Sequence, residues 1–406
     1  MIAISHNQRR EPLDWTLLWA LAGLMVLGVA FIYSACIAAE SDSNHHWYQQ
    51  NFIKQIIWYS IGVSAMVAAA LIDYHTLARW SAVGYWAGIL FLVAVLIPSI
   101  GTTHNWGARR WIDLGSFQMQ PSEFAKLAFI LGLANFIGRP ADEMKRPRIF
   151  FSAIGMMALP FLLIMKEPDL GSALVFIPVG LVMLYIGGAP VKYMVLIGGV
   201  VGALIVLLLV DILYMPVNLQ IRLEKYQRNR ILVYFNRKFS DSAPRNATAA
   251  ELQKLAIEQR NDSYNVKQAL ISVGSGGLMG KGWRQGTQNA LGYLPRAVAH
   301  NDFIFSVIAE ESGFVGSVVV ITLYAVVLFT GIRIAGQARD RLGKLMAVGV
   351  VTLLFSHVFI NIGMNIRLMP VTGVPLPLLS YGGSSVLCSL IAAGLLQNVH
   401  IHRRDY

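Results

Sequence analysis

A long apolar segment places the strongest constraint on how this chain can fold. Residues 195–214 read VLIGGVVGALIVLLLVDILY, which includes a single charged side chain. A helix of that length spans a hydrocarbon core of roughly 30 Å. Soluble domains are about a quarter charged, whereas this 406-residue chain is 14% charged and 55% hydrophobic. The chain is therefore predicted to be an integral membrane protein.

Apolar segments of similar length recur along the whole sequence. They predict an all-α polytopic membrane protein of about ten transmembrane helices, with residues 1–406 in a single membrane domain. Several segments contain Gly or Pro, which membrane helices tolerate when neighbouring groups satisfy the backbone. The segments are 15–36, 53–72, 80–98, 122–138, 149–165, 170–187, 191–214, 303–330, 345–366 and 380–399.

The distribution of basic residues predicts the orientation. With a cytoplasmic N-terminus, most Arg and Lys residues of the short connections fall inside, as the positive-inside rule requires. Both termini are then cytoplasmic, and residues 215–302 form a large extracytoplasmic loop between the seventh and eighth helices. Within this loop, residues 247–260 have the periodicity of a short helix. The net charge of +11 is attributed to cytoplasmic loops and an anionic lipid surface rather than to nucleic acid.

Two features that resemble reactive or ligand-binding motifs are interpreted as structural. Cys36 and Cys388 have no spacing typical of disulfides or metal ligands, so both are expected to be packing residues. The glycine-rich segment GSGGLMGKG lacks the Ser or Thr that follows Lys in a nucleotide-binding P-loop, because Gly282 follows Lys281. A turn at the membrane surface is expected there.

Unusual charged residues gather in the segments predicted to lie outside. Arg109 and Arg110 suit an anionic ligand such as a phosphate, although contact with lipid headgroups explains them equally well. Glu123 and Lys126 are three residues apart and can pair on one helix face, either as a structural ion pair or beside a polar cavity. A serine, Ser380, precedes small residues that allow close helix approach.

Three acidic residues at predicted helix starts have competing interpretations. Asp169 can cap the helix that follows or contact a ligand, whereas Glu167 has no such simple structural role. Asp302 lies where the polar loop meets the eighth helix, so it is either an N-cap or a partly desolvated general base. Glu310 and Glu311 lie deeper on that helix and are expected to anchor neighbouring helices rather than pair with Asp302.

Six motifs occur in the order found in one known family. They are GARRWIDLG, QPSEFAKLA, EPDLGSAL, GSGGLMGKGW, DFIFSVIAEE and LMPVTGVPLPLLSYGGSS, and they span residues 107–385. The chain thus resembles the SEDS family of bacterial cell-wall glycan polymerases, the RodA, FtsW and SpoVE group. Its PVTGVPLP sequence resembles the RodA branch, which acts in cell elongation and rod-shape maintenance.

The resemblance implies a peptidoglycan glycosyltransferase that polymerises lipid II, an undecaprenyl-pyrophosphate-linked disaccharide-pentapeptide, with inversion. The family's essential acidic residue matches Asp302, which by this analogy activates the 4-hydroxyl of the acceptor sugar. Basic external side chains would steady the pyrophosphate leaving group. The expected substrate-binding residues are Arg109, Arg110, Glu123, Lys126, Glu167, Lys281 and Ser380.

The resemblance also implies a cellular setting. It places the chain in the bacterial cytoplasmic (inner) membrane, with its active site on the extracytoplasmic side. The expected partners are a class B penicillin-binding protein transpeptidase and other membrane proteins of the elongation complex. No cofactor is required by the motifs, although a divalent cation such as magnesium can bridge a pyrophosphate.

The sequence departs from the family at three places, and two other functions compete with the polymerase. Asn301 replaces the Thr that commonly precedes the catalytic Asp, LPRAVAHND is two residues longer than usual, and residues 237–260 include extra sequence. The Asn side chain can still donate a hydrogen bond to Asp302. The competing functions are a lipid II flippase or transporter and a non-catalytic scaffold for a transpeptidase.

Overall fold

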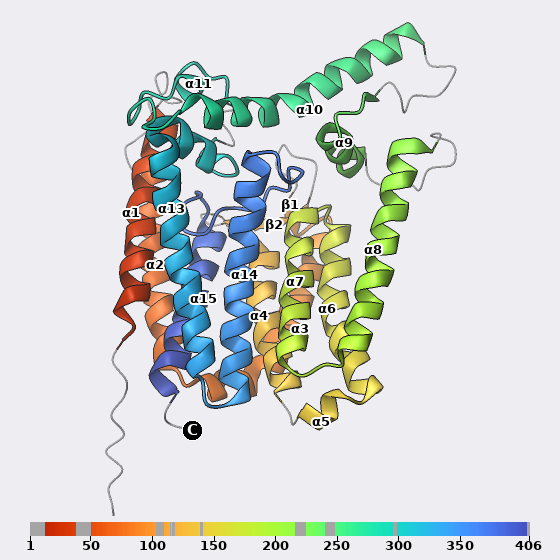
Figure 1. The fold of residues 1–406 in the computed structure, drawn as a ribbon, viewed down its shortest axis with the longest axis vertical. Coiled ribbons are helices and arrows are strands. Elements are labelled where there is room, and N and C mark those ends of the chain that lie inside the picture. The colour runs from red at the N-terminus through yellow and green to blue at the C-terminus, as the bar shows by residue number, and fades with distance from the viewer. Residues whose placement is uncertain are drawn as a thin grey trace, which may run out of the picture.

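Each predicted apolar segment forms a helix in the computed structural model of the protein (Figure 1). The structure describes residues 13–37, 50–102, 109–113, 115, 118–138, 141–215, 225–239, 248–294 and 299–403. The bundle helices are α1 (Trp15–Ile37), α2 (Asn51–Leu71), α3 (Tyr74–Leu96), α4 (Pro121–Ile137), α6 (Pro147–Lys166), α7 (Leu170–Ile186), α8 (Val191–Tyr214), α13 (Ile304–Gln337), α14 (Arg341–Asn365) and α15 (Gly383–His402).

These helices form the predicted polytopic membrane fold. Within the described ranges, eight helices are long and apolar enough to cross a membrane, while α7 is apolar but shorter. The helix α4 has 17 residues and carries the charged Glu123 near its start. The described chain begins and ends at the same end of the bundle (Figure 1). There Asp14 exchanges two hydrogen bonds with Gln397 of α15, at 3.1 Å and 2.9 Å.

Burial differs sharply between helices that are all apolar. In the most apolar stretch of α15, 89% of the residues are buried, compared with 6% in α8. The helix α15 lies inside the bundle, and α8 stands at its margin (Figure 1). In water such an exposed apolar helix would be unstable, whereas lipid chains can cover it on all sides. The contrast is the pattern expected when the bilayer serves as the solvent.

The segment between α8 and α13 lies over one end of the bundle. It carries α9 (Lys225–Tyr234), α10 (Ala249–Ser275) and α11 (Thr287–Ala290), with α10 running across the bundle end (Figure 1). The helix predicted at 247–260 is therefore the first half of a longer one. A small antiparallel sheet lies at the same end, and the short helix α5 (Ala141–Met144) at the other. The sheet consists of β1 (Gly101–Thr102), β2 (Trp111–Asp113) and β3 (Gln118–Met119), in that order.

The helix α13 is broken at Gly313, and the glycine-rich segment fills the break. Gly313 has φ 65° and ψ −158°, a conformation that suits glycine. Before the break, the carbonyls of Glu310 and Glu311 accept hydrogen bonds of 3.0 Å from the amides of Lys281 and Gly282. After the break, the amides of Phe314 and Val315 donate to the carbonyls of Gly277 and Leu278, at 2.9 Å and 3.1 Å. The backbone groups freed by the break are thus satisfied within the protein.

We predict that Gly313→Ala destabilises the protein. A Cβ on Gly313 would overlap the main-chain nitrogen of Gly280, and a positive φ costs a non-glycine residue about 1 kcal/mol or more. Gly336→Ala, on the same helix with open space around its Cβ position, is the control and is expected to be neutral or slightly stabilising. Thermal unfolding in detergent would compare the two. Equal midpoints would show that the break does not require glycine.

Candidate active site

The turn that contains Asp302 is held from below by two buried asparagines of α14. The side-chain amides of Asn361 and Asn365 each donate a hydrogen bond of 3.1 Å to the main-chain carbonyl of Asp302. Asn361 also donates to the carbonyl of Val374 at 2.8 Å. Ser306, in the first turn of α13, donates to the Asn365 side chain at 2.6 Å. The backbone of Asp302 is therefore fixed relative to both α13 and α14.

The loop between α14 and α15 holds the same turn from the other side. The Ser380 hydroxyl donates to the carbonyl of Asn301 at 2.6 Å and accepts from the amide of Leu376 at 2.8 Å. Tyr381 donates its amide to the carbonyl of His300 at 2.9 Å. Ser380 is 1% exposed. Its observed contacts are thus with the protein backbone, and its predicted contact with substrate stays a prediction.

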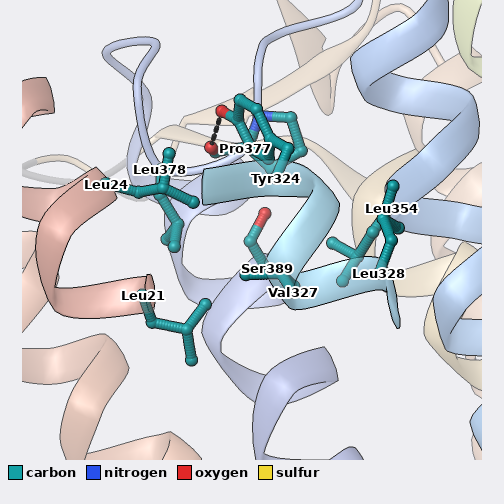
Figure 2. Close-up of a pocket in the computed structure, with 9 residues that line it drawn as sticks. All are labelled: Leu21, Leu24, Tyr324, Val327, Leu328, Leu354, Pro377, Leu378 and Ser389. Carbon is teal, nitrogen blue, oxygen red and sulfur yellow. Dashed lines mark hydrogen bonds between the residues drawn. The ribbon is translucent and has the colours of Figure 1, made fainter. Parts of the chain in front are cut away.

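Below this loop the bundle interior is closely packed. Figure 2 shows Tyr324 of α13, whose hydroxyl donates to the carbonyl of Pro377 at 2.5 Å. Four of the nine residues that line the surrounding cavity are leucines of α1, α13 and α14, and the cavity has a volume of about 10 Å³. Such a space holds at most about one water molecule. The loop at Pro377 therefore rests on a dense apolar layer.

The carboxylate of Asp302 is partly buried and does not cap α13. The N-cap residue of α13 is Phe303, which makes no side-chain cap hydrogen bond. In the described part of the chain no hydrogen bond reaches the Asp302 carboxylate. Loss of hydration raises its pKa to about 6, although Arg230 and Arg110 act in the opposite direction. Of the two predicted roles for Asp302, the N-cap is wrong, and the general base stays a prediction.

Arg110 joins the small β-sheet to the start of α7. Its guanidinium donates to the carbonyl of Pro168 and lies 3.9 Å from a carboxylate oxygen of Asp169. Asp169 accepts a hydrogen bond of 3.1 Å from the amide of Ser172 and another of 3.2 Å from Gln120. Asp169 therefore caps α7, as one of its two predicted roles required, and also lies within the charge field of Asp302.

Glu167, at the end of α6, is a buried acid of a different kind. It is 1% exposed, and neither carboxylate oxygen has a hydrogen-bond partner among the described residues. Burial raises its pKa to about 9, and the negative charge of Asp169 adds to the effect, whereas Arg110 opposes it. At neutral pH the group is therefore protonated and able to donate a hydrogen bond.

Glu123 and Lys126 form the predicted pair in the first turns of α4. The Lys126 ammonium lies 2.6 Å from the Glu123 carboxylate and 2.8 Å from His357 Nε2 of α14. The side chains of the pair are 3% and 2% exposed. A buried lysine needs both charge compensation and hydrogen bonds. Glu123 supplies the opposite charge, and the histidine supplies a further hydrogen-bond partner. The pairing is confirmed, and its predicted contact with substrate stays a prediction.

Lys281 forms an ion pair with another buried acid. Its ammonium lies 2.6 Å from a carboxylate oxygen of Glu310, which also accepts a hydrogen bond of 3.0 Å from the amide of Gln288. Eight residues separate Glu310 from Asp302, a rise of about 12 Å along a helix. The pair therefore reinforces the break in α13 at a distance from Asp302. Glu311 accepts a hydrogen bond of 2.6 Å from Ser34 of α1, which confirms its predicted anchoring role.

The remaining predicted features have simpler surroundings. Arg109 is partly exposed beside β2, and no hydrogen bond or ion pair to it is present among the described residues. Asn301 donates no hydrogen bond to Asp302 in the described structure, and its side-chain oxygen is buried without a partner there. Residues 295–298, within the lengthened LPRAVAHND stretch, lie outside the described residues, as do residues 240–247 of the extra sequence.

Sequence reasoning missed three residues that shape this site. Arg230 of α9 is the largest positive influence on Asp302, yet it is one of many basic residues in the long loop. Asn361 and Asn365 carried a usable signal, because two amides spaced by four residues in an apolar helix lie on one face and need partners. Arg230 had no comparable signal.

Known proteins resemble this chain over nearly its whole length. A family model for the FtsW, RodA and SpoVE proteins, described as cell cycle proteins, matches residues 15–405. The peptidoglycan glycosyltransferase MrdB of Escherichia coli K12 is 34% identical over 94% of this chain and 93% of its own length. The peptidoglycan glycosyltransferase RodA of Treponema pallidum is 32% identical, covering 95% and 97% of the two chains.

Two solved structures share the fold. One chain comes from a peptidoglycan synthase complex that coordinates polymerization and crosslinking, with 27% identity, a TM-score of 0.72, and coverage of 97% of this chain and 99% of that one. The other is the rod shape determining protein RodA of Thermus thermophilus, with 26% identity, a TM-score of 0.64 and coverage of 97% and 98%. The match across residues 15–405 shows that this chain belongs to the FtsW/RodA/SpoVE family.

Proposed function

We propose that this protein is a peptidoglycan glycosyltransferase of cell elongation that polymerises glycan strands from lipid II at Asp302. The observation that carries the proposal is a carboxylate on a rigidly held turn, with a pKa raised to about 6 and within the electrostatic influence of two arginines. A base with a pKa near the working pH accepts protons most effectively. The relatives named peptidoglycan glycosyltransferases, MrdB and RodA, support this activity.

In the proposed reaction, Asp302 acts as the general base. The acceptor's 4-hydroxyl gives its proton to Asp302 and attacks the anomeric carbon of the donor. The bond from that carbon to the pyrophosphate breaks, so the configuration inverts and the lipid pyrophosphate leaves as an anion. Hydrogen bonds from Asn361 and Asn365 fix the main chain of Asp302 before the substrate arrives. Such preorganisation avoids rearrangement during the reaction.

The leaving pyrophosphate requires positive charge nearby. Arg109 is partly exposed, Arg110 lies at the start of α7, and Arg230 approaches Asp302 from α9. Planar guanidinium groups match phosphate oxygens well. Glu167 is neutral and can donate a further hydrogen bond at the same end.

The described residues near Asp302 form no binding site for magnesium. Among the described residues, no three acidic, histidine or cysteine side chains converge as a metal site. Asp169 already accepts hydrogen bonds at both oxygens, and Glu167 is protonated. These residues do not fit a magnesium site made of protein ligands. The proposed reaction therefore uses no metal ion.

The proposal includes the orientation of the protein in the membrane and a transpeptidase partner. The bundle end at which α1 begins carries Arg146, Arg333, Arg341, Lys344 and Arg403, which favours its location on the cytoplasmic side of a bacterial inner membrane. Asp302 then faces the extracytoplasmic side. The related chain in the synthase complex supports a membrane-anchored transpeptidase, a class B penicillin-binding protein, as the partner.

We expect Asp302→Asn to abolish polymerisation of fluorescent lipid II by purified protein in detergent. Loss of a general base lowers rates by about 10²–10⁴-fold. Detergent removes the two-sided membrane that flipping requires, so glycan formation by the unaltered protein distinguishes a polymerase from a flippase. Asp113→Asn, an exposed carboxylate in β2, is the control and is expected to remain active. Full polymerising activity of the Asp302→Asn variant would contradict the general-base role. Normal growth of the variant, with no glycan made by the unaltered protein, would instead favour the scaffold.

We expect kcat/KM to rise with pH and to reach half its plateau near pH 6. The base must be deprotonated, and the Asp302 pKa is about 6. Because Arg230 lowers that pKa, Arg230→Gln is expected to move the midpoint to higher pH. Arg228→Gln, on the same helix, is the control and is expected to leave the midpoint in place. A pH profile that is unchanged by Arg230→Gln would show that Arg230 does not lower the pKa of the catalytic base.

We expect Glu167→Gln to reduce the pH dependence of stability. The folded pKa of Glu167 is raised from 4.5 to about 9, so its stabilising contribution is complete below pH 4.5 and is lost as pH rises through 9. Gln preserves the shape of the neutral acid but cannot ionise. Between pH 5 and 9, the unfolding temperature of the variant should therefore rise relative to that of the unaltered protein as pH increases. Parallel curves would mean that Glu167 is ionised in the folded protein.

A further inference from the structure

A polar pocket lies at the opposite end of α13 from Asp302. It is formed where α1 begins, α13 ends and α15 ends, and it has a volume of about 290 Å³. This volume is close to the lower limit of about 300 Å³ for small-molecule sites. The described chain enters and leaves the bundle beside it. No residue of the proposed active site lines it.

The polar side chains of the pocket carry a net positive charge. Asp14 is 5% exposed and accepts a hydrogen bond from the guanidinium of Arg333. The guanidinium of Arg403 donates to Gln337 and lies 3.1 Å from His400 Nδ1. The pocket thus contains two guanidinium groups and one carboxylate. Because Arg333 is 49% exposed and a guanidinium has five donors, it retains donors beyond its bond to Asp14.

The surfaces beside the pocket are apolar and exposed. Trp15 and Trp19, four residues apart on α1, are 60% and 71% exposed. On α13, Phe329 lies one turn from Arg333 and is 71% exposed, and its neighbour Ile332 is 55% exposed. Such side chains are stable on a surface covered by lipid, and Trp is enriched where lipid chains meet the headgroups. The pocket therefore opens at the edge of the bilayer.

We propose that this pocket binds the phosphate headgroup of an anionic phospholipid, with Arg333 and Arg403 as the anion-binding residues. Guanidinium groups bind phosphate oxygens through paired, charge-assisted hydrogen bonds. Basic pockets between membrane helices at the cytoplasmic surface are suited to anionic lipid headgroups. A free phosphate has the same binding chemistry. The exposed aromatic surface on α1 and α13 favours the lipid, because the acyl chains can cover it.

The test measures phosphatidylglycerol retained by the full-length protein in native mass spectrometry. Protein purified in detergent micelles that contain phosphatidylcholine is titrated with phosphatidylglycerol, with more phosphatidylcholine, or with inorganic phosphate. Phosphatidylglycerol should bind and raise the unfolding temperature, whereas the other two should not. Arg403→Gln should weaken phosphatidylglycerol binding about tenfold, which corresponds to about 1.4 kcal/mol.

Two further variants keep the proposal falsifiable. Arg333→Lys retains the charge beside Asp14 but loses the planar fork, so it should weaken binding even if Arg403→Gln folds poorly. Arg148→Gln, an exposed arginine at the start of α6 at the same bundle end, is the control and should bind normally. Normal binding by Arg403→Gln and Arg333→Lys, or an equal loss in Arg148→Gln, would overturn the proposal. Equal stabilisation by inorganic phosphate would also overturn it, because the site would then bind anions without lipid.

Discussion

The two hydrogen bonds from α14 to the carbonyl of Asp302 are the constraint on which the site depends. In an apolar bundle, an amide without a partner costs several kcal/mol. Asn361 and Asn365 are both fully buried, so their amides strongly favour the one arrangement in which the Asp302 turn and the loop at Val374 supply acceptors. The polar groups that define the site are therefore positioned by the cost of leaving them unsatisfied.

Three carboxyl groups near this turn have different surroundings, and two of them have raised pKa values. Asp169 has hydrogen-bond donors at both oxygens and a nearby guanidinium. Glu167 is buried without partners, so burial raises its pKa to about 9. The pKa of Asp302 is intermediate, because burial raises it and the positive charges of Arg230 and Arg110 partly offset that rise. Burial and nearby charges thus give two carboxyl groups of one fold different pKa values at the same end of the bundle.

The sequence predicted the helices well because lipid solvation demands long apolar segments wherever the chain crosses. It also predicted the Glu123–Lys126 pair and the cap at Asp169, since both depend on residues close in sequence. It did not predict that Arg230 acts on Asp302. That relation depends on how α9 lies over the bundle, and no local pattern encodes such a tertiary arrangement. Ser380 and Lys281 were recognised as unusual, but their partners, Asn301 and Glu310, became evident only in three dimensions.

The break at Gly313 explains why a glycine-rich segment far from Asp302 belongs to the same structure. An unbroken helix satisfies its own backbone, so the main chain of α13 would form no hydrogen bonds with residues 276–282. The break exposes carbonyls at Glu310 and Glu311 and amides at Phe314 and Val315, and the glycine-rich segment bonds to all four. Lys281 adds a charge pair at the same point. The first part of α13, which begins beside Asp302, is thereby held by α14 at one end and by the glycine-rich segment at the other. A substitution in the glycine-rich segment can therefore disturb Asp302 without touching it.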